Sequence, residues 1–425
     1  MKKLTLGLLF IGFTFLVFYL YNLGQRPDRT YPSFPIQPEK NAATIHDSIP
    51  LRDVVVAGNN WDGVITIFDP NTYEIIKKIS AMPDREERFE ETYSGVKRRL
   101  AAGLIREVVG EGNDQLVDDM FTSNDGRYIY ASRPSFADVV AIDVNSGEIA
   151  WRTPVEGIRA DHSAISPDGK IFLVSASTAR KVHAIDVTTG EIVGEFESGD
   201  QPHENTYSED GTKIYHASIG KVYVTSPSLD FIKGDRWFQI VDAETYEVIR
   251  RVDMKEKLEE AGFPWIDSAI RPMAITKDEK FAYLQISLFH GFFEYDIEND
   301  KITRKLNLPE ANKDLALGDH LLNSGHHGIA LSGDDKTICV AGTMDGYIAM
   351  VDRETFEYQT IKLSDDPKEA KPYWATSSKD GTKAYVSISG LDKVSVVDYA
   401  TKKVVAEVPV GNHPQRVRNG QLRLK

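Results

Sequence analysis

The chain has only one cysteine among its 425 residues, Cys339, so no intrachain disulfide can form. Cys339 lies in the apolar stretch KTICVAG, which supplies no neighbouring base. The pattern therefore predicts a buried, unreactive thiol rather than a nucleophile. Apolar residues make up 41% of the chain and charged residues 27%, which is the composition of a folded globular protein rather than a disordered one.

Basic residues are scarce. The chain has 50 Lys and Arg against 64 Asp and Glu, and its formal net charge is -14. Proteins that bind DNA or RNA need clustered Lys and Arg to neutralise phosphates, so the sequence predicts no nucleic-acid partner. It also lacks a GxSxG nucleophile elbow, a phosphate-binding loop and a dinucleotide fingerprint, and so does not indicate the enzyme classes that depend on those motifs.

The longest apolar run stands at the N-terminus, where residues 4–21 carry no charge and follow Lys2 and Lys3. The run is just long enough to cross a bilayer as a helix, and the two lysines favour a cytoplasmic N-terminus. We therefore expect a membrane anchor over residues 1–22. The protein would then be a single-pass protein of the cell membrane, with its body on the extracytoplasmic (periplasmic or extracellular) side. A cleaved signal peptide is the alternative.

Residues 23–48 contain four prolines and are expected to form an extended tether. Residues 49–425 are expected to form one folded domain, because a repeat runs through this part of the chain.

Each copy of the repeat has an apolar strand that ends in Asp, a turn, and a second strand, as in VHAIDVTTGEIVGEF. Long repeats of this kind indicate solenoids or propellers. The strand-ending aspartates are Asp69, Asp143, Asp186, Asp242, Asp296, Asp352 and Asp398. The sequence therefore contains seven copies.

A second hairpin signal, such as ISPDGKIFLVS, precedes six of the copies. Asp-Gly between apolar alternations marks a hairpin, because Gly accepts the positive φ of the turn. The turn aspartates are Asp125, Asp168, Asp210, Asp278, Asp334 and Asp380. Two hairpins give four strands per copy, so the sequence predicts an all-β, seven-bladed β-propeller of four-stranded blades.

The first copy begins at Leu51 with what matches a second strand, so its opening strand is missing. Residues 408–420, VPVGNHPQRVRNG, repeat the connection that elsewhere precedes the opening strand. We expect residues 415–419 to pair with the first blade, so that the C-terminal strand closes the ring and removes an exposed edge. A frayed tail is the alternative.

Over residues 50–420 the chain resembles the YVTN-type β-propeller family. The resemblance is carried by the PDGxxxYVS-like hairpins, the VxVIDxxTGE-like hairpins and the VPVGxxP connector at Val408–Pro414. It implies the propeller fold and little about function, because propellers serve as binding modules, scaffolds and enzymes.

Four insertions interrupt the repeat: residues 81–113, 222–236, 253–268 and 308–325. The first has the charge and apolar pattern of an amphipathic helix, and the third predicts a short helix ended by Gly262 and Pro264. The first, third and fourth follow the last strand of a blade and so lie on one face of the ring. Long loops on one face commonly build a binding site, so we expect the function there. The alternative is that these insertions only cover the ring.

Propeller ligands bind near the central axis, where the innermost strands start. Alignment on the turn aspartates places carboxylates, imidazoles, arginine and aromatic rings at these starts, where a simple repeat would have small or apolar residues. The residues so placed are Asp118, Asp119, Asp161, His162, His203, Glu204, Arg271, His327, Tyr373 and Trp374, with His326 and Arg416 close to the same level.

Three interpretations of this ring stay open. His162, His203, His326 and His327 could ligate copper or another divalent metal. Asp118, Asp119, Arg271, Tyr373, Trp374 and Arg416 could hold a small polar ligand. In the third interpretation, the ring of residues lines a polar, water-filled channel.

If the protein is an enzyme, Asp161 with His162 and His203 with Glu204 are its candidate acid–base pairs. The sequence therefore favours a membrane-anchored propeller that binds a small molecule or protein partner on the channel-mouth face. The first alternative is a copper-type oxidoreductase. The second is a hydrolase or lyase of the lactonase type.

Overall fold

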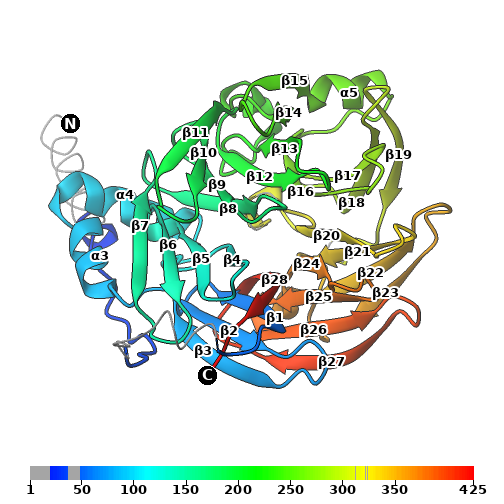
Figure 1. The fold of residues 1–425 in the computed structure, drawn as a ribbon. Coiled ribbons are helices and arrows are strands. Elements are labelled where there is room, and N and C mark those ends of the chain that lie inside the picture. The colour runs from blue at the N-terminus through cyan, green and yellow to red at the C-terminus, as the bar shows by residue number, and fades with distance from the viewer. Residues whose placement is uncertain (1–19, 37–47, 312, 321, 323) are drawn as a thin grey trace, which may run out of the picture.

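The computed structural model describes residues 20–36 and 48–425, except residues 312, 321 and 323. Seven four-stranded antiparallel sheets surround a central axis, so the predicted all-β, seven-bladed propeller is confirmed (Figure 1). We number the sheets as blades 1 to 7 in chain order.

Blades 1 to 4 consist of strands as follows: blade 1, β28 (Pro414–Leu422), β1 (Arg52–Asn59), β2 (Val64–Phe68) and β3 (Ile75–Ser80); blade 2, β4 (Met120–Thr122), β5 (Tyr128–Arg133), β6 (Asp138–Asp143) and β7 (Ile149–Pro154); blade 3, β8 (Ala160–Ile165), β9 (Ile171–Ala176), β10 (Lys181–Asp186) and β11 (Ile192–Glu197); blade 4, β12 (Pro202–Tyr207), β13 (Lys213–Ser218), β14 (Trp237–Asp242) and β15 (Val248–Asp253).

Blades 5 to 7 continue the series: blade 5, β16 (Ile270–Ile275), β17 (Phe281–Ile286), β18 (Gly291–Asp296) and β19 (Lys301–Asn307); blade 6, β20 (Gly328–Leu331), β21 (Thr337–Gly342), β22 (Tyr347–Asp352) and β23 (Tyr358–Lys362); blade 7, β24 (Pro372–Ser377), β25 (Lys383–Ile388), β26 (Lys393–Asp398) and β27 (Lys403–Pro409).

The C-terminal strand β28 lies in the same sheet as β1 and pairs with it in antiparallel register, with Val56 opposite Arg418. Blade 1 therefore takes its first strand from the C-terminus and its other three from the start of the folded body, as the sequence predicted.

The repeated aspartates shape the turns. Asp186, at the end of β10, accepts the backbone N–H groups of Thr188 at 2.8 Å and Thr189 at 3.0 Å. Asp168, in the turn before β9, accepts the Ser166 hydroxyl at 2.7 Å. A side chain that bonds to the backbone two or three residues later fixes a tight turn, which explains why Asp recurs at these positions.

Apolar side chains of neighbouring blades pack against each other to form the core. Phe172 and Val174 of β9, for example, are fully buried in a cluster with Tyr130 and Ala141 of blade 2. Cys339 is fully buried in a similar cluster, and burial raises the pKa of its thiol to about 12, as expected of an unreactive cysteine.

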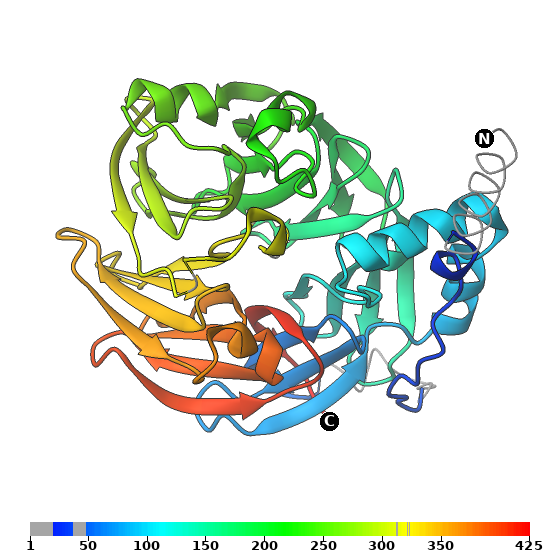
Figure 2. The ribbon, with the colours of Figure 1, turned by 180° about the vertical axis from the view of Figure 1, so that it is seen from behind.

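The insertions contain most of the helical residues. Residues 81–113 form two helices, α3 (Arg85–Thr92) and α4 (Gly95–Val108), rather than one, because Tyr93 and Ser94 separate them with non-helical backbone. Figure 2 shows α4 extending from the rim of the ring toward its centre. The other insertions hold η2 (Pro227–Ile232), α5 (Met254–Glu260) and η3 (Leu317–Asp319).

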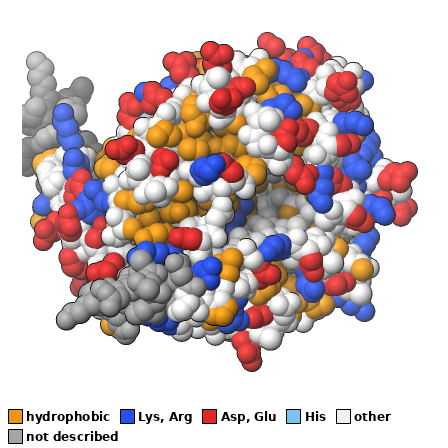
Figure 3. Space-filling model, viewed as in Figure 1, with side chains coloured by type: hydrophobic (Ala, Val, Ile, Leu, Met, Phe, Trp, Pro, Cys, Tyr) orange, Lys and Arg blue, Asp and Glu red, His pale blue; other side chains and the backbone are white. Residues whose placement is uncertain are grey.

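Further short helical turns are η1 (Pro134–Phe136), α6 (Pro367–Ala370) and η5 (Ser389–Leu391). On the face seen in Figure 3, acidic and basic side chains are mixed around the rim, and hydrophobic side chains gather over part of the surface.

The structure contradicts the predicted single-pass membrane location. Among the described residues, no helix is long and apolar enough to cross a membrane. Most of the predicted anchor, residues 1–19, lies outside the described residues. Part of the predicted tether packs against the first insertion, since the Arg106 guanidinium donates to the backbone carbonyls of Leu23 and Gln25, each at 3.0 Å.

Candidate functional site

A cavity of about 600 Å³ lies where the innermost strands begin, and we call it the axial cavity. The charged and aromatic residues that line it come from blades 2 to 5 and 7 and from the C-terminal strand. They are Asp118, Arg159, Asp161, His162, His203, Tyr223, Arg271, Tyr373 and Arg416. Seven of these nine were selected from the sequence, because counting back from the turn aspartates gives the level of each strand start. Arg159 and Tyr223 were missed.

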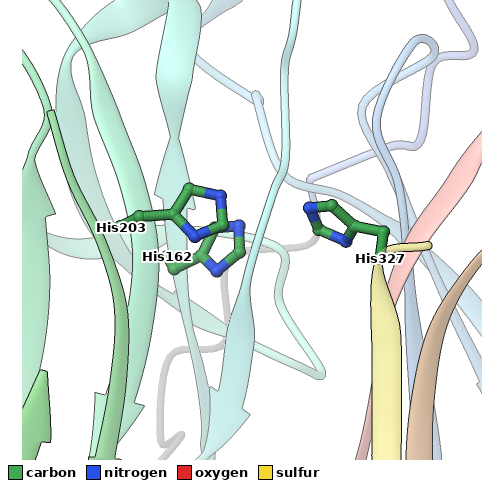
Figure 4. A group of neighbouring side chains, drawn as sticks. All are labelled: His162, His203 and His327. Atoms are coloured by element: carbon green, nitrogen blue, oxygen red, sulfur yellow. The ribbon is translucent and has the colours of Figure 1, made fainter. Parts of the chain in front are cut away.

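Three histidines meet beside this cavity (Figure 4). The rings of His162 and His203 lie together with their centroids 3.6 Å apart, and His327 points toward them from the other side, with its ring centroid 5.8 Å from that of His203. One ring nitrogen of each lies within 4.8 Å of the others. All three side chains are buried.

These imidazoles are neutral at physiological pH. Burial holds the pKa of each far below its usual value, and the positive charges of Arg416 and Arg271 lower it further. A neutral imidazole can accept a hydrogen bond or ligate a metal through one nitrogen. The Nδ1 atom of His327 lies 3.2 Å from the Tyr373 carbonyl, to which only an N–H can donate, so its Nε2 atom carries the lone pair.

His162 is held between Glu204 and Arg416. Its Nε2 atom accepts from the Arg416 guanidinium, which can only donate, so Nδ1 carries the proton and donates to Glu204 Oε2 at 2.6 Å. Burial raises the pKa of Glu204 to about 8. The predicted pair of His203 with Glu204 is therefore replaced by a contact between Glu204 and His162 of the neighbouring blade, because adjacent residues of a strand point to opposite faces.

Arg271 is 1% exposed, yet among the described residues its Nε and Nη1 atoms have no hydrogen-bond partner. No carboxylate of the described chain forms an ion pair with it. Burial lowers the pKa of Arg271, but a guanidinium stays protonated in proteins. Among the described residues, Arg271 is thus a buried cation without an ion-pair partner, and it lines the cavity.

Arg416 is also 1% exposed and lies 4.3 Å above the Trp374 ring. Its nearest carboxylate is Asp118, whose Oδ2 atom is 3.7 Å away and whose pKa burial raises to about 6. The Nε and Nη1 atoms of Arg416 lack partners among the described residues. The cavity therefore has two cationic side chains with unused donors.

Two of the predicted ligand-binding residues lie behind the cavity wall. The carboxylate of Asp119 accepts two hydrogen bonds from the Arg418 guanidinium, at 2.9 and 2.7 Å, and is occupied by them. Trp374 donates to the Thr376 hydroxyl at 2.8 Å and supports Arg416 through its ring face. Asp119 therefore positions Arg418, and Trp374 positions Arg416.

His326 lies apart from the three axial histidines. It directly precedes His327, and successive residues of an extended chain point in opposite directions. Its Nε2 atom donates to Oδ2 of Asp345, in the turn between β21 and β22, at 2.8 Å. The structure therefore brings together three of the four histidines that were predicted as metal ligands.

Most of the apolar residues that line the cavity come from the insertions. Helix α4 contributes Leu104, Ile105 and Val108, the residue after it contributes Val109, and the second and fourth insertions contribute Val222 and Leu322. The amphipathic pattern of residues 81–113 predicted a helix, but no local signal showed that it would reach the axis. The first insertion thus covers part of the channel mouth.

No family model matches the chain, and no curated protein sequence matches it, so the YVTN-type resemblance rests on the repeat motifs alone. Many solved structures share the fold. One is Kuenenia stuttgartiensis hydrazine synthase, which is 16% identical over 70% of this chain and 88% of the other, with a TM-score of 0.53. At this identity the likeness shows the propeller fold alone.

Proposed function

We propose that the axial cavity binds a small organic anion with an apolar body, and that Arg271 is the counter-ion of its charged group. The observation that carries this proposal is the buried Arg271 guanidinium, which has no ion-pair partner among the described residues. The ligand class is a carboxylate or a phosphate monoester, since both accept two parallel hydrogen bonds from a guanidinium.

The energetics favour an anion. An uncompensated charge in a protein interior costs several kcal/mol, and such charges are normally paired. Arg133 illustrates the usual arrangement, since it is 0% exposed and donates to Asp138 at 2.7 and 2.8 Å. No carboxylate of the described residues is bonded to Arg271 in this way, and an anionic ligand would supply the missing charge.

Arg416 and the histidines complete the polar end of the site. Arg416 offers unused Nε and Nη1 donors. The histidines are neutral, so they add hydrogen-bonding atoms to the site without adding charge. A charged headgroup would lie between Arg271 and Arg416, with the Tyr373 ring beside it. This arrangement agrees with the sequence-based prediction of a small polar ligand and adds the sign of its charge.

The apolar body is inferred from the cavity walls. Leu104, Ile105 and Val108 of α4 face the cavity together with Val222 and Leu322. Burial of apolar ligand surface against such side chains contributes about 25 cal/mol per Å². A ligand with a hydrocarbon or aromatic body would therefore bind more tightly than inorganic phosphate or acetate.

A metal centre at His162, His203 and His327 is the second candidate, and it is supported by the three buried ring nitrogens within 4.8 Å of one another. Neutral imidazoles suit copper, zinc or iron. The Nε2 atom of His327 has no partner among the described residues. Arg416, however, bonds to the Nε2 atom of His162 and would have to move before all three histidines could ligate one ion.

Thermal unfolding with a series of acids tests the anion proposal. We expect carboxylates from acetate to decanoate, and the matching alkyl phosphates, to raise Tm increasingly with chain length. A ligand at a hundred times its Kd should stabilise the protein by about 2.7 kcal/mol. Arg271→Met should remove this effect, whereas Arg52→Gln, which changes a 44% exposed arginine that does not line the cavity, should keep it. If no acid raises the Tm of the wild type more than it raises the Tm of Arg271→Met, the proposal fails.

Metal analysis of the purified protein tests the second candidate, the axial metal centre. Stoichiometric copper, zinc or iron that is lost in both His203→Ala and His327→Ala would support an axial metal centre, and metal that both variants retain would belong elsewhere. The copper-type oxidoreductase, the lactonase-type hydrolase and a protein partner on this face stay predictions from the sequence.

A further inference from the structure

The axial cavity also holds a buried carboxylate that the proposed anion site does not use. Asp118 lies two residues before β4, and its backbone N–H donates to the Ser132 carbonyl of β5 at 3.0 Å, which fixes the chain at this point. Asp118 is 2% exposed and lines the cavity. Its Oδ2 atom has no hydrogen-bond partner among the described residues. Asp118 is therefore a buried acceptor with unused capacity.

The two other carboxylates at this level are bonded to arginines. Asp161 accepts a hydrogen bond from the Arg159 guanidinium, and Asp119 accepts two from Arg418. Asp118 and Asp119 differ in this way because adjacent residues of an extended chain point in opposite directions. A buried polar group without a partner costs free energy, so the position of Asp118 favours a ligand that donates a hydrogen bond to it.

The spacing of Asp118 and Arg416 suits a ligand that carries a cationic donor next to its carboxylate. The Nη2 atom of Arg416 lies 3.7 Å from Oδ2 of Asp118, which is too long for a hydrogen bond. In an α-amino acid, the nitrogen lies about 2.5 Å from the carboxyl carbon. The ammonium of such a ligand can therefore donate to Asp118 while its carboxylate accepts from the unused Nε and Nη1 atoms of Arg416.

A metal ion fits this part of the cavity less well than an ammonium group does. Asp118, Asp161 and His162 each offer one ligand atom, and these atoms lie within 4.8 Å of one another. However, Asp161 accepts from Arg159, and the Nε2 atom of His162 accepts from Arg416. An ion would find only the Asp118 carboxylate unoccupied, whereas an ammonium group needs only acceptors, and each carboxylate has several lone pairs.

We propose that the ligand of the axial cavity carries an ammonium group beside its carboxylate, and that Asp118 binds this ammonium. The inference rests on the proposed anion site and narrows its ligand class to amino acids with a large apolar side chain. The carboxylate binds Arg271 and Arg416, and the apolar side chain packs against Leu104 and Val108 of α4. Such a zwitterion supplies both partners that the described residues do not provide, an anion for Arg271 and a donor for Asp118.

Calorimetric titration of the full chain at neutral pH with three matched acids tests this inference. Decanoate, 2-hydroxydecanoate and 2-aminodecanoate have the same carbon chain and differ only at the carbon next to the carboxylate. We expect 2-aminodecanoate to bind the wild type at least tenfold more tightly than either of the other two acids does. Asp118→Asn keeps the size of the side chain and removes its charge, so it should bind decanoate and 2-aminodecanoate with similar affinity.

Binding of decanoate by Asp118→Asn shows that the cavity of the variant is intact. Asp118→Ser is a second variant, and it should lose the preference for 2-aminodecanoate in the same way. Asp365→Asn is the matched control, because Asp365 is fully exposed and does not line the cavity. It should keep the preference of the wild type.

The outcomes separate this inference from the anion site on which it rests. If the wild type binds 2-aminodecanoate no more tightly than it binds decanoate or 2-hydroxydecanoate, the ligand has no ammonium group at Asp118. The same conclusion holds if the Asp118 variants keep the preference. In both cases, binding of decanoate that is lost in Arg271→Met would still support the anion site. If the wild type binds none of the three acids, the anion site and this inference both fail.

Discussion

The Nδ1 atom of His162 lies 2.6 Å from Oε2 of Glu204, so two neighbouring blades form a buried imidazole–carboxylate pair beside the axial cavity. Both groups are shielded from water, and burial shifts the pKa of each toward its neutral form. The pair therefore makes stability depend on pH in a direction that can be worked out.

The Glu204 carboxyl has a pKa of about 8 in the folded protein, compared with 4.5 for the unfolded chain. Between these values the folded state holds a proton that the unfolded state has lost, so the stability that this group contributes falls as pH rises. From pH 6.5 to 8, the wild type should lose up to about 1.4 kcal/mol per pH unit relative to Glu204→Gln. Urea unfolding of both proteins across this range measures the difference, and parallel curves would contradict it.

Replacement of Arg271 should leave the ligand-free protein as stable as before or more stable. Arg271→Met removes a buried cation that has no ion-pair partner in the described part of the chain, so we expect a gain of about 1–3 kcal/mol. Arg133→Met is the matched comparison, because Arg133 is equally buried but bonded to Asp138 and Asp84. That change should cost about 3–5 kcal/mol. Equal losses in the two variants, measured by chemical unfolding, would mean that Arg271 has a structural partner.

Helix α4 should contribute to affinity through its apolar face. Leu104 and Val108 line the cavity but are 56% and 38% exposed, so their replacement should hardly affect folding. We expect Leu104→Gln and Val108→Gln each to weaken binding of decanoate about three- to tenfold, because apolar contact is lost. Val96→Gln is the control, since Val96 is on the same helix, is 74% exposed and does not line the cavity. Unchanged affinity in both cavity variants would remove α4 from the site.

The blades could be predicted from the sequence because their signals are local. An Asp such as Asp186 bonds to the backbone within three residues, so the turn is encoded where it occurs. Counting back from each turn then gave the level of the strand starts and selected Arg271, His203 and His327. The C-terminal strand could be assigned to blade 1 for the same reason, since its motif matched the other connections.

The contacts between blades could not be predicted in this way. His326 and His327 are adjacent, and only the direction of the chain at that point sends one to Asp345 and the other toward the axis. Glu204 was assigned to His203 by proximity in sequence, whereas the twist of the sheets brings it to His162. The packing of α4 depends on an insertion whose path no repeat determines.

The most direct test of the account is a calorimetric cycle that changes the charge of the ligand and of Arg271 separately. The most stabilising acid of the series and its methyl ester are titrated into the wild type and into Arg271→Met. We expect the acid to bind the wild type at least tenfold more tightly than the ester does, and this preference to disappear in the variant. If the acid and the ester bind the wild type equally, or if Arg271→Met keeps the preference for the acid, Arg271 is not the counter-ion of a bound anion.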